Sequence, residues 1–404
     1  MRPDLLESPL VARLRDALAG VDGAWLVGGA VRDLLLGREV VDLDVVVEGD
    51  GVAAARAAAG ALGGAAREHG RFGTATVVAP DGLAFDVVGA RAESYPAPGA
   101  LPEVRPGTLE EDLARRDFTV NAIALALAGG ELRAHPGALE DLEARVLRIL
   151  HPRSFADDPT RLLRLVRYAA RLGLRPDTRT DALARDAIAA GALRTVSGPR
   201  IGAELLLLCG EERAIAALSL AEEMGLTGAL ELSPRVDLAR DALNYAGEGG
   251  GEGGAPRARR DLVVLATSLT RRREPGLSEW LDGMGLTATE REAVSAAALE
   301  AETLAERLEH AHRPSEVRHL VLGRPPEQLA VAAGLGAGEP VRRWMEEWSR
   351  VGLAVDGGDL IAAGLEEGPQ IGAALDAAWS AALDEGVDDR DGQLAAALRA
   401  ARAQ

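Results

Sequence analysis

The sequence predicts an α+β protein with a small mixed head and a long helical remainder. Up to about residue 145, short Val- and Leu-rich runs alternate with helical patterns, whereas from Leu139 onward leucine, alanine and arginine recur at helical spacing. A chain of 404 residues is too long for one ordinary core, so we expect two to four domains. The patterns indicate a head over residues 1–145, a helical neck over 146–235 and a helical body and tail over 236–404.

The elements of the head follow one another in a regular order. GVAAARAAAGALG (51–63) has the composition and length of a helix. Runs rich in Val and other strand-forming residues predict strands on either side of it, at AWLVG (24–28), VDLDVVV (41–47), TATVV (74–78) and LAFDVV (83–88). In the helical remainder, AGEGGGEGGAP (246–256) cannot hold regular structure and predicts a flexible linker or loop.

Composition limits the class of protein. No apolar run approaches the roughly 18 residues of a membrane span. The start, MRPDLLESPLVARLRDAL, is amphipathic and acid-bearing rather than signal-like, so we expect a cytoplasmic protein without a membrane partner. Cys209 is the only cysteine, which excludes a disulfide framework and a cysteine-based zinc site; its context, ELLLLC, predicts a core position. The net charge of -18 argues against nonspecific nucleic-acid binding over the whole surface.

Two acids interrupt the second predicted strand. Residues two apart on a strand share a face, so Asp42 and Asp44 project together, about 7 Å apart, while Leu43 and Val45 face the core. Like carboxylates repel each other, and a divalent cation such as Mg²⁺, which takes one or two carboxylates plus substrate phosphates, removes that conflict. The alternative is a solvated edge strand whose acids oppose aggregation.

A glycine pair precedes these acids. Gly28 and Gly29 close the first strand, and Ala30 to Asp33 open a helix, with Arg32 in its first turn. Backbone N–H groups at a helix start can bind phosphate, although a glycine pair alone is more often a tight turn. Followed by the D-x-D pair, the turn predicts an anion cradle that faces a metal site.

These motifs, G-G-A-V-R-D, L-L-L-G and D-L-D, resemble the signature of the class II tRNA nucleotidyltransferase and bacterial poly(A) polymerase family, one of the polymerase-β-like nucleotidyltransferases. The resemblance implies a polymerase-β-like head with a mixed sheet, followed by an all-α neck, body and tail. It also implies that Gly28, Gly29 and Arg32 hold a nucleoside triphosphate, and that Asp42 and Asp44 bind Mg²⁺.

A second segment, RRDFTVNA, agrees with the family motif that handles the sugar of the incoming nucleotide. Arg116 supplies a donor fork and Asp117 an acceptor, which suit phosphate and ribose hydroxyls. Taken alone, the pair could equally be a surface Arg–Asp pair that leads into a helix.

A third segment, FADDPTRLLRLVR, resembles the E-D-x-x-R motif of the family, with Asp157 in place of the glutamate. Asp158 before Pro159 also fits an N-cap followed by an N1 proline, which needs no ligand. A carboxylate and a guanidinium would together accept the amine and donate to the ring nitrogen of cytosine or adenine, and would reject uracil and guanine. In the resembled family this pair, here Asp158 and Arg161, serves as an amino-acid template.

The helix after this motif carries an acid-free arginine stripe. Arg161, Arg164, Arg167 and Arg171 fall within 120° of one another at 100° per residue, which favours binding of a nucleotide or another polyanion. Between Arg145 and Arg200, twelve arginines stand against five acids. The expected nucleotide contacts therefore include Arg164 and Arg167.

Other signals are weaker or absent. Asp86, in FDVV, matches the place of a third acid that acts as a metal ligand or as a base for the attacking hydroxyl, but it could equally be a structural aspartate. His135 stands where the family has an acidic turn, and we expect it to be a loop residue. No His-Asp dipeptide is present, which argues against a metal phosphohydrolase domain.

The prediction is template-independent addition of C and/or A nucleotides to the 3′ end of tRNA, with CTP and ATP as substrates and the tRNA acceptor end as partner. CCA addition, CC addition and A addition remain open, and poly(A) synthesis on diverse RNA ends is the nearest alternative. A catalytically inactive RNA-binding protein would have no reason to keep two repelling acids. A small-molecule nucleotidyltransferase would lack the second and third segments. The oligomeric state is not predicted.

Overall fold

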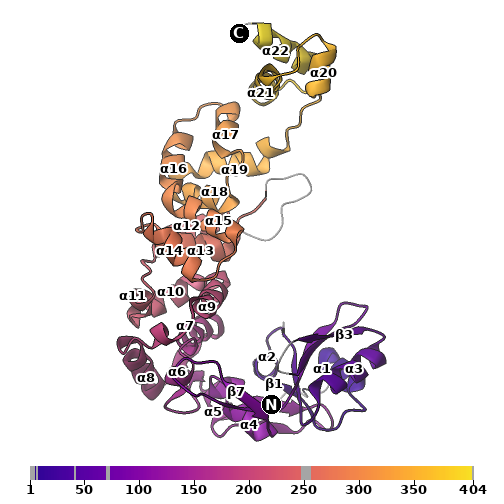
Figure 1. Ribbon diagram of the computed structural model, residues 1–404, viewed down its shortest axis with the longest axis vertical. Helices are drawn as coiled ribbons and strands as arrows, with labels where there is room; N and C mark the ends of the chain where they lie inside the picture. Colours follow the sequence, from indigo (N-terminus) through magenta and orange to yellow (C-terminus); the bar gives the residue numbers. More distant parts are fainter. Residues whose placement is uncertain (1–4, 6–7, 41, 70–72, 247–255, 403–404) are drawn as a thin grey trace. The chain divides into compact units, whose positions relative to one another are not determined.

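The computed structural model describes residues 5, 8–40, 42–69, 73–246 and 256–402. They form two compact units: Met1–Ser197 with Leu220–Ala229, and Gly198–Ser219 with Leu230–Gln404 (Figure 1). We call them the first and the second unit and describe each by itself. The predicted glycine-rich linker, 246–256, lies outside the described residues except for its two ends.

A seven-stranded mixed sheet organises the first unit, as predicted. Its strand order is β3-β4-β5-β2-β1-β8-β9, and β2 and β5 run parallel while the other neighbours are antiparallel. The strands are β1 (Ala24–Val27), β2 (Asp44–Val47), β3 (Ala65–His69), β4 (Thr74–Val78), β5 (Ala84–Gly89), β8 (Ile123–Ala126) and β9 (Leu132–Ala134). The central position of β2 places its acids in the middle of the sheet.

Four of these strands coincide with the predicted ones, and several others were not predicted. The sequence of β8, IALA, is buried at every position and therefore shows no alternation. A separate hairpin joins β6 (Arg91–Ser94) to β7 (Glu103–Pro106). The expectation that strands end at Leu139 was wrong, because β10 (Val146–Leu147) pairs with β11 (Arg175–Pro176). Two-residue strands are too short to leave a periodic signal.

Helices complete the first unit. The predicted helix is α3, which begins after its cap Asp50 and ends at the left-handed Gly63. Apolar residues of α4, Leu109 and Leu113, pack with Trp25 and Val27 of β1 in a core beneath the sheet. The helices are α1 (Pro9–Ala17), α2 (Gly29–Leu35), α3 (Gly51–Leu62), α4 (Leu109–Ala114), α5 (Ala138–Glu143), α6 (Ser154–Asp157), α7 (Arg161–Leu172), α8 (Thr178–Ala189) and α11 (Leu226–Ala229).

The described part of the second unit is helical, apart from one isolated bridge between Ala246 and Ala258. Its centre is α13, where every residue from Leu262 to Leu269 is buried. Cys209 is buried in α9, as expected, and burial raises the pKa of its thiol. Beyond α10 (Ala214–Glu223), which the two units share, the helices are α9 (Gly198–Gly210), α12 (Val236–Leu243), α13 (Arg260–Leu269), α14 (Gly276–Gly283), α15 (Ala288–Leu299), α16 (Ala301–Glu309), α17 (Pro314–Val321), α18 (Pro326–Ala332), α19 (Gly338–Glu346), α20 (Gly357–Ala362), α21 (Pro369–Asp384) and α22 (Arg390–Arg402).

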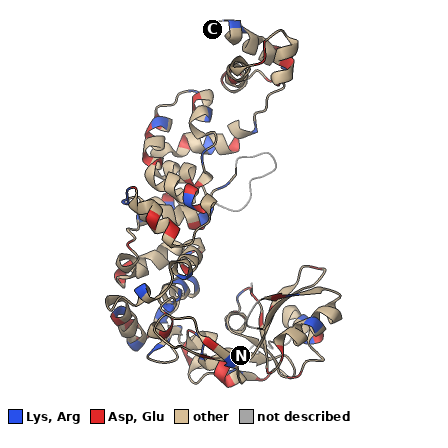
Figure 2. Ribbon diagram, viewed as in Figure 1, with Lys and Arg blue, Asp and Glu red and all other residues tan. Residues whose placement is uncertain are grey.

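Two further properties of these helices concern their basic residues and their apolar length. Basic residues gather on α7 and its neighbours in the first unit (Figure 2). None of the helices in the described residues combines the length and the apolar character needed to cross a membrane.

Candidate active site

Three carboxylates lie together at one end of the central strands. Asp44 begins β2, and the parallel register pairs its Cα with that of Asp86 on β5. Asp42 precedes β2 by two residues, and both Asp42 and Asp44 are exposed, whereas Leu43 and Val45 are buried as predicted. The sheet therefore brings Asp86, whose role the sequence left open, directly beside the D-x-D pair.

The electrostatics of Asp44 reflect this crowding. Although Asp44 is exposed at the surface, the surrounding protein removes part of the water around its carboxyl and raises its pKa; the positive charge of Arg116 opposes that, and the negative charges of Asp86 and Asp42 add to it. In the described ranges no three or more His, Cys, Asp or Glu side chains are arranged to hold a metal ion by themselves. Two or three repelling oxygen donors, with further oxygens from substrate phosphates, nevertheless match the chemistry that Mg²⁺ accepts.

Asp86 is held by neighbouring strands. The Thr76 hydroxyl on β4 donates to Asp86 Oδ1, and Nε2 of His69 lies 2.8 Å from the same hydroxyl oxygen. Thr76 and Asp86 are direct cross-strand partners in the antiparallel register. The interaction fixes one carboxylate oxygen of Asp86.

The glycine turn lies between β1 and α2, where it was predicted. Gly28 has a φ of 69°, and a Cβ atom there would lie 2.4 Å from Nη1 of Arg116. The positive φ favours glycine, and a Cβ atom there would displace the guanidinium of Arg116. Arg32, in contrast, is buried: it donates to both oxygens of Asp33 at 2.9 and 2.8 Å and to Oδ1 of Asn121. Arg32 thus ties α2 to the RRDFTVNA segment.

The RRDFTVNA segment follows α4 and buries its acid. Asp117 Oδ1 accepts from the backbone N–H of Phe118 and from Nδ2 of Asn121, both at 2.8 Å, and Oδ2 accepts from Nε of Arg164 at 2.8 Å. Burial alone would raise the pKa of Asp117, but the charge of Arg164, these hydrogen bonds and the charge of Arg161 outweigh it and lower the pKa to about 2. Asp117 is therefore an ionised group that anchors the neck to the head.

The N-cap alternative for Asp158 is supported by its contacts. The side chain of Asp158 accepts from the backbone N–H and the hydroxyl of Thr160, at 3.1 and 2.7 Å. The backbone of Asp158 is extended, whereas Thr160 already has helical angles, and the regular part of α7 begins at Arg161. A carboxylate that accepts from the N–H two residues on makes the contact of an N-cap, with Pro159 as the first helical residue.

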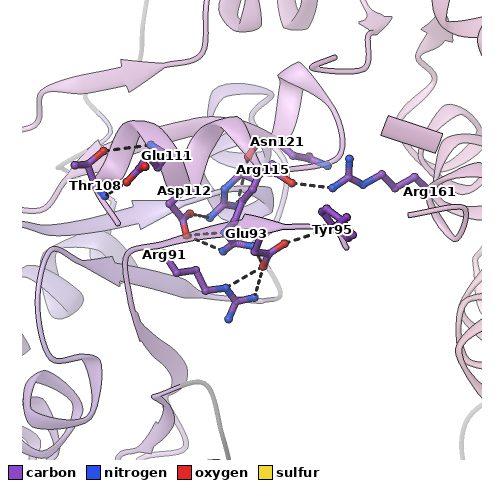
Figure 3. Close-up of polar contacts among 10 residues, drawn as sticks. Arg91, Glu93, Tyr95, Thr108, Glu111, Asp112, Arg115, Asn121 and Arg161 are labelled. Carbon is purple, nitrogen blue, oxygen red and sulfur yellow. Dashed lines mark hydrogen bonds and ion pairs between the residues drawn. The ribbon is translucent and has the colours of Figure 1, made fainter. Parts of the chain in front are cut away.

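Within the first unit, Arg161 connects the predicted neck to the predicted head. It is 5% exposed. Its Nη1 donates to Oγ of Ser154 at 2.6 Å. Its Nη2 donates to the backbone carbonyl of Arg115 at 2.8 Å (Figure 3). Tyr95 lies close enough for the charges of Arg161 and Asp158 to influence it, and burial is the main reason that its pKa rises to about 12. The two predicted base-selecting residues thus face the same half-buried tyrosine.

The arginine stripe of α7 is not the free charged face that its spacing suggested. Arg161 and Arg167 are buried, and Arg164 pairs with Asp117 at 2.6 Å. The guanidinium carbons of Arg164 and Arg167 lie 5.5 and 5.0 Å from the ring centroid of Tyr168, and that of Arg32 lies 5.4 Å from it. The acid that pairs with this stripe is Asp117, which lies outside α7. Sequence spacing along one helix therefore could not reveal it.

Several residues of this site were not predicted. Asp112 on α4 accepts from both Arg115 and Arg116, and Glu93 on β6 accepts from Arg115 and from the hydroxyl of Tyr95 (Figure 3). For Asp112 a signal was available, because it precedes the arginine pair by three and four residues, the spacing of helical ion pairs. Glu93 gave no such signal, since only the hairpin brings it to Arg115.

Comparisons with known proteins agree with this geometry. Residues 24–148 match the poly A polymerase head domain. The A-adding tRNA nucleotidyltransferase of Geobacter sulfurreducens is 42% identical over 228 residues, which cover 55% of this chain and 26% of that protein. The CC-adding tRNA nucleotidyltransferase of Deinococcus radiodurans is 48% identical over 191 residues, or 46% of this chain and 50% of that protein.

A solved structure extends the likeness to the helices. The Thermotoga maritima CCA-adding enzyme complexed with tRNA has a TM-score of 0.73 and 27% sequence identity, and the alignment covers 98% of this chain and 97% of that one. The chain nevertheless spans only a quarter to a half of the length of the curated relatives named above. Residues 24–148 are thus similar to the poly A polymerase head domain, and the chain resembles the tRNA nucleotidyltransferases.

Proposed function

We propose that this protein adds C and/or A nucleotides to the 3′ end of tRNA without a template, using CTP and/or ATP and releasing pyrophosphate. The observation that carries the proposal is the placement of Asp44 beside Asp86, with Asp42 two residues away and Arg116 over the Gly28 turn. Acidic and basic groups are thus set next to each other, as transfer from a metal-bound triphosphate requires. The names of the relatives supply the RNA substrate.

The residues at the strand ends would serve the chemical step. In that step the 3′ oxygen of the RNA bonds to the α-phosphorus as the bond to pyrophosphate breaks. Asp42 and Asp44 would hold a divalent metal, Mg²⁺ in this proposal, which when bound neutralises phosphate charge and favours loss of the hydroxyl proton. Asp86, oriented by Thr76, completes the acidic group. Its role as a third catalytic acid is part of the proposal.

The walls of the site would position the nucleotide. Gly28, Gly29 and Arg116 lie on the side proposed for the phosphates, and Arg32 supports them from beneath. Asp117 would act on the sugar side by holding Arg164 and Asn121 in place, because both of its oxygens already accept hydrogen bonds from protein groups.

Base selection would fall to the start of α7. Asp158 and Arg161 present an acceptor and a donor, the pair that matches cytosine and adenine but mismatches uracil and guanine. Arg164 and Arg167 would support this pair around Tyr168. The contacts of Arg161 to Ser154 and to Arg115 fix the direction of its guanidinium before a nucleotide enters.

Poly(A) synthesis is the second candidate, since the matching head domain is that of poly A polymerases. The relatives include both an A-adding and a CC-adding enzyme at comparable identity, so resemblance does not choose between specialists.

One experiment separates these possibilities. The protein and Mg²⁺ are incubated with CTP, with ATP or with both, and with tRNA that ends before CCA, after C or after CC, and the product lengths are read on a gel. Stopping after three added nucleotides supports CCA addition, and addition of only CC or only A identifies a specialist. Long A tails on unrelated RNAs would contradict the tRNA proposal, and no incorporation on any substrate would refute nucleotidyl transfer.

A further inference from the structure

A buried carboxylate joins the two arginines of the RRDFTVNA segment. The side chain of Asp112 on α4 is completely buried. Its Oδ1 accepts from Nη2 of Arg115 at 2.7 Å, and its Oδ2 accepts from Nη2 of Arg116 at 3.0 Å (Figure 3). The two arginines lower the pKa of Asp112 against the effect of burial, so the carboxylate is ionised. One buried negative charge therefore faces two positive ones.

The two arginines are not equally satisfied. Arg115 also donates to Glu93 at 3.0 Å, so two nearly buried acids share it. Within the described part of the chain, Asp112 is the one acid that forms an ion pair with Arg116. Nη1 of Arg116 makes a long 3.5 Å contact with the carbonyl of Asn121, and its buried Nε has no hydrogen-bond partner. The guanidinium of Arg116 therefore keeps donor capacity that its protein contacts do not use.

The position of Arg116 shows which ligand group it would meet. Its Nη1 lies 2.4 Å from the place that a Cβ atom on Gly28 would take, and its charge acts on the Asp44 carboxyl. The guanidinium thus lies against the glycine turn and within electrostatic range of a proposed metal-binding acid. A planar fork in that place suits the oxygens of a phosphate chain.

We infer that Asp112 is a positioning residue that holds Arg116 over the Gly28 turn, where Arg116 binds the triphosphate of the incoming nucleotide, while Arg115 serves the structure alone. The inference rests on the proposed function and assigns distinct roles to two adjacent arginines. Replacement of Asp112 by Asn keeps the shape but removes the charge, and it turns an N–H₂ group toward one of the two guanidinium groups. Arg116 would then lose its fixed direction.

The test measures binding of inorganic triphosphate, a probe that has neither base nor sugar, by titration calorimetry of the full chain with Mg²⁺ present. We expect Asp112→Asn to raise the dissociation constant about tenfold to a hundredfold, the size expected for loss of a charge-assisted hydrogen bond. Glu93→Gln is the matched control: Glu93 is also an almost buried carboxylate on Arg115, but it forms no ion pair with Arg116. We expect this control to bind triphosphate as the wild type does.

Folding is checked by thermal melting of every variant. If Asp112→Asn does not fold, the double variant Asp112→Asn/Arg115→Gln is tested in its place. The double variant removes one buried charge of each sign, so no buried charge is left without its partner. Arg115→Gln alone should leave the dissociation constant unchanged, and the double variant should raise it. Equal weakening by Asp112→Asn and Glu93→Gln, or no weakening by either Asp112 variant, overturns the inference.

The proposed function is tested separately in the same preparations. Wild-type protein that binds triphosphate but transfers no nucleotide to tRNA would refute the function and leave the role of Asp112 standing. Wild-type protein that transfers nucleotides, together with an Asp112→Asn variant whose triphosphate affinity is unchanged, would refute the role of Asp112 alone.

Discussion

At the scale of single residues, the site consists of carboxylates that have opposite electrostatic surroundings. Asp117 is surrounded by donors and stays ionised at low pH, while Asp44 has other acids beside it and its pKa is raised. The first arrangement stabilises the fold. The second leaves a conflict that a bound cation relieves.

Asp117 should make the stability of the protein depend on pH. Its pKa of about 2 in the folded protein lies below the ordinary value of 3.8, so its contribution is complete above pH 4 and is lost as the pH falls toward 2. That contribution amounts to about 2 kcal/mol. In urea titrations, the free energy of unfolding of the wild type should exceed that of Asp117→Asn by about this amount at pH 7 and by much less at pH 2. A margin that does not change with pH would contradict the assignment.

Asp44 should be required for transfer but not for folding. Asp44→Asn keeps the shape of the side chain and removes one of the negative charges that repel each other, so we expect incorporation of CTP and ATP to fall below detection with an unchanged melting temperature. Asp50→Asn is the control, because Asp50 is an exposed cap of α3 that follows the opposite end of β2 from Asp44. Retained incorporation by Asp44→Asn would rule out the proposed metal site.

Arg161 should control the choice of base. Arg161→Ala removes the donor that cytosine and adenine accept, so the preference for CTP and ATP over UTP and GTP should fall about tenfold or more, the loss expected for one charged hydrogen bond. Competition between labelled nucleotides measures the preference. A uniform loss of rate with all four nucleotides would instead indicate a structural role.

At the scale of elements, the turn between β1 and α2 is the most constrained segment of the site. The sequence of β1, its turn and α2 was sufficient to place these elements, because a buried strand, a glycine pair and an amphipathic helix each leave a local pattern. The strands β6, β7, β8 and β9 left none, because each is only three or four residues long and β8 is buried throughout, so neither a long run nor an alternation marks them.

This turn allows a matched pair of substitutions. Gly28 and Gly37 have nearly the same φ, 69° and 65°, but only at Gly28 would a Cβ meet another group, Nη1 of Arg116. Both alanine variants should lose about 1 kcal/mol or more of stability from the left-handed backbone. Only Gly28→Ala should also weaken binding of ATP, measured by calorimetry. Equal ATP affinity in the two variants would show that Arg116 does not contact the bound nucleotide.

At the scale of the whole molecule, a chain of net charge -18 has a local excess of arginines over acids between Arg145 and Arg200. We expect association with RNA at this segment, where local charge acts within a Debye length of about 8 Å. The second unit contains a further small core at its end, in which Leu360, Ala374 and Ala397 pack together.

The neck should bind tRNA mainly through phosphate contacts. Arg175 and Arg179 are exposed, and replacing either by Ser should weaken tRNA binding and lower the slope of log K against log salt by about one. Arg185→Ser is the control, because Asp181 already pairs with Arg185 at 2.9 Å. Filter binding at several salt concentrations measures the slopes. Identical slopes for all three variants would place the RNA elsewhere.

The sequence by itself determined the α+β class, four central strands, the helix α3, the glycine turn and the acids of the site. Each of these leaves a local signal, either a period of hydrophobicity or a short motif. Only the tertiary structure decided that Asp86 stands beside Asp44, that Asp117 pairs with Arg164 of the arginine stripe, and that Asp112 is buried beside both of its neighbouring arginines. These contacts join segments separated by long stretches of chain or depend on burial, and a pattern along one chain does not contain the partner that folding brings to it.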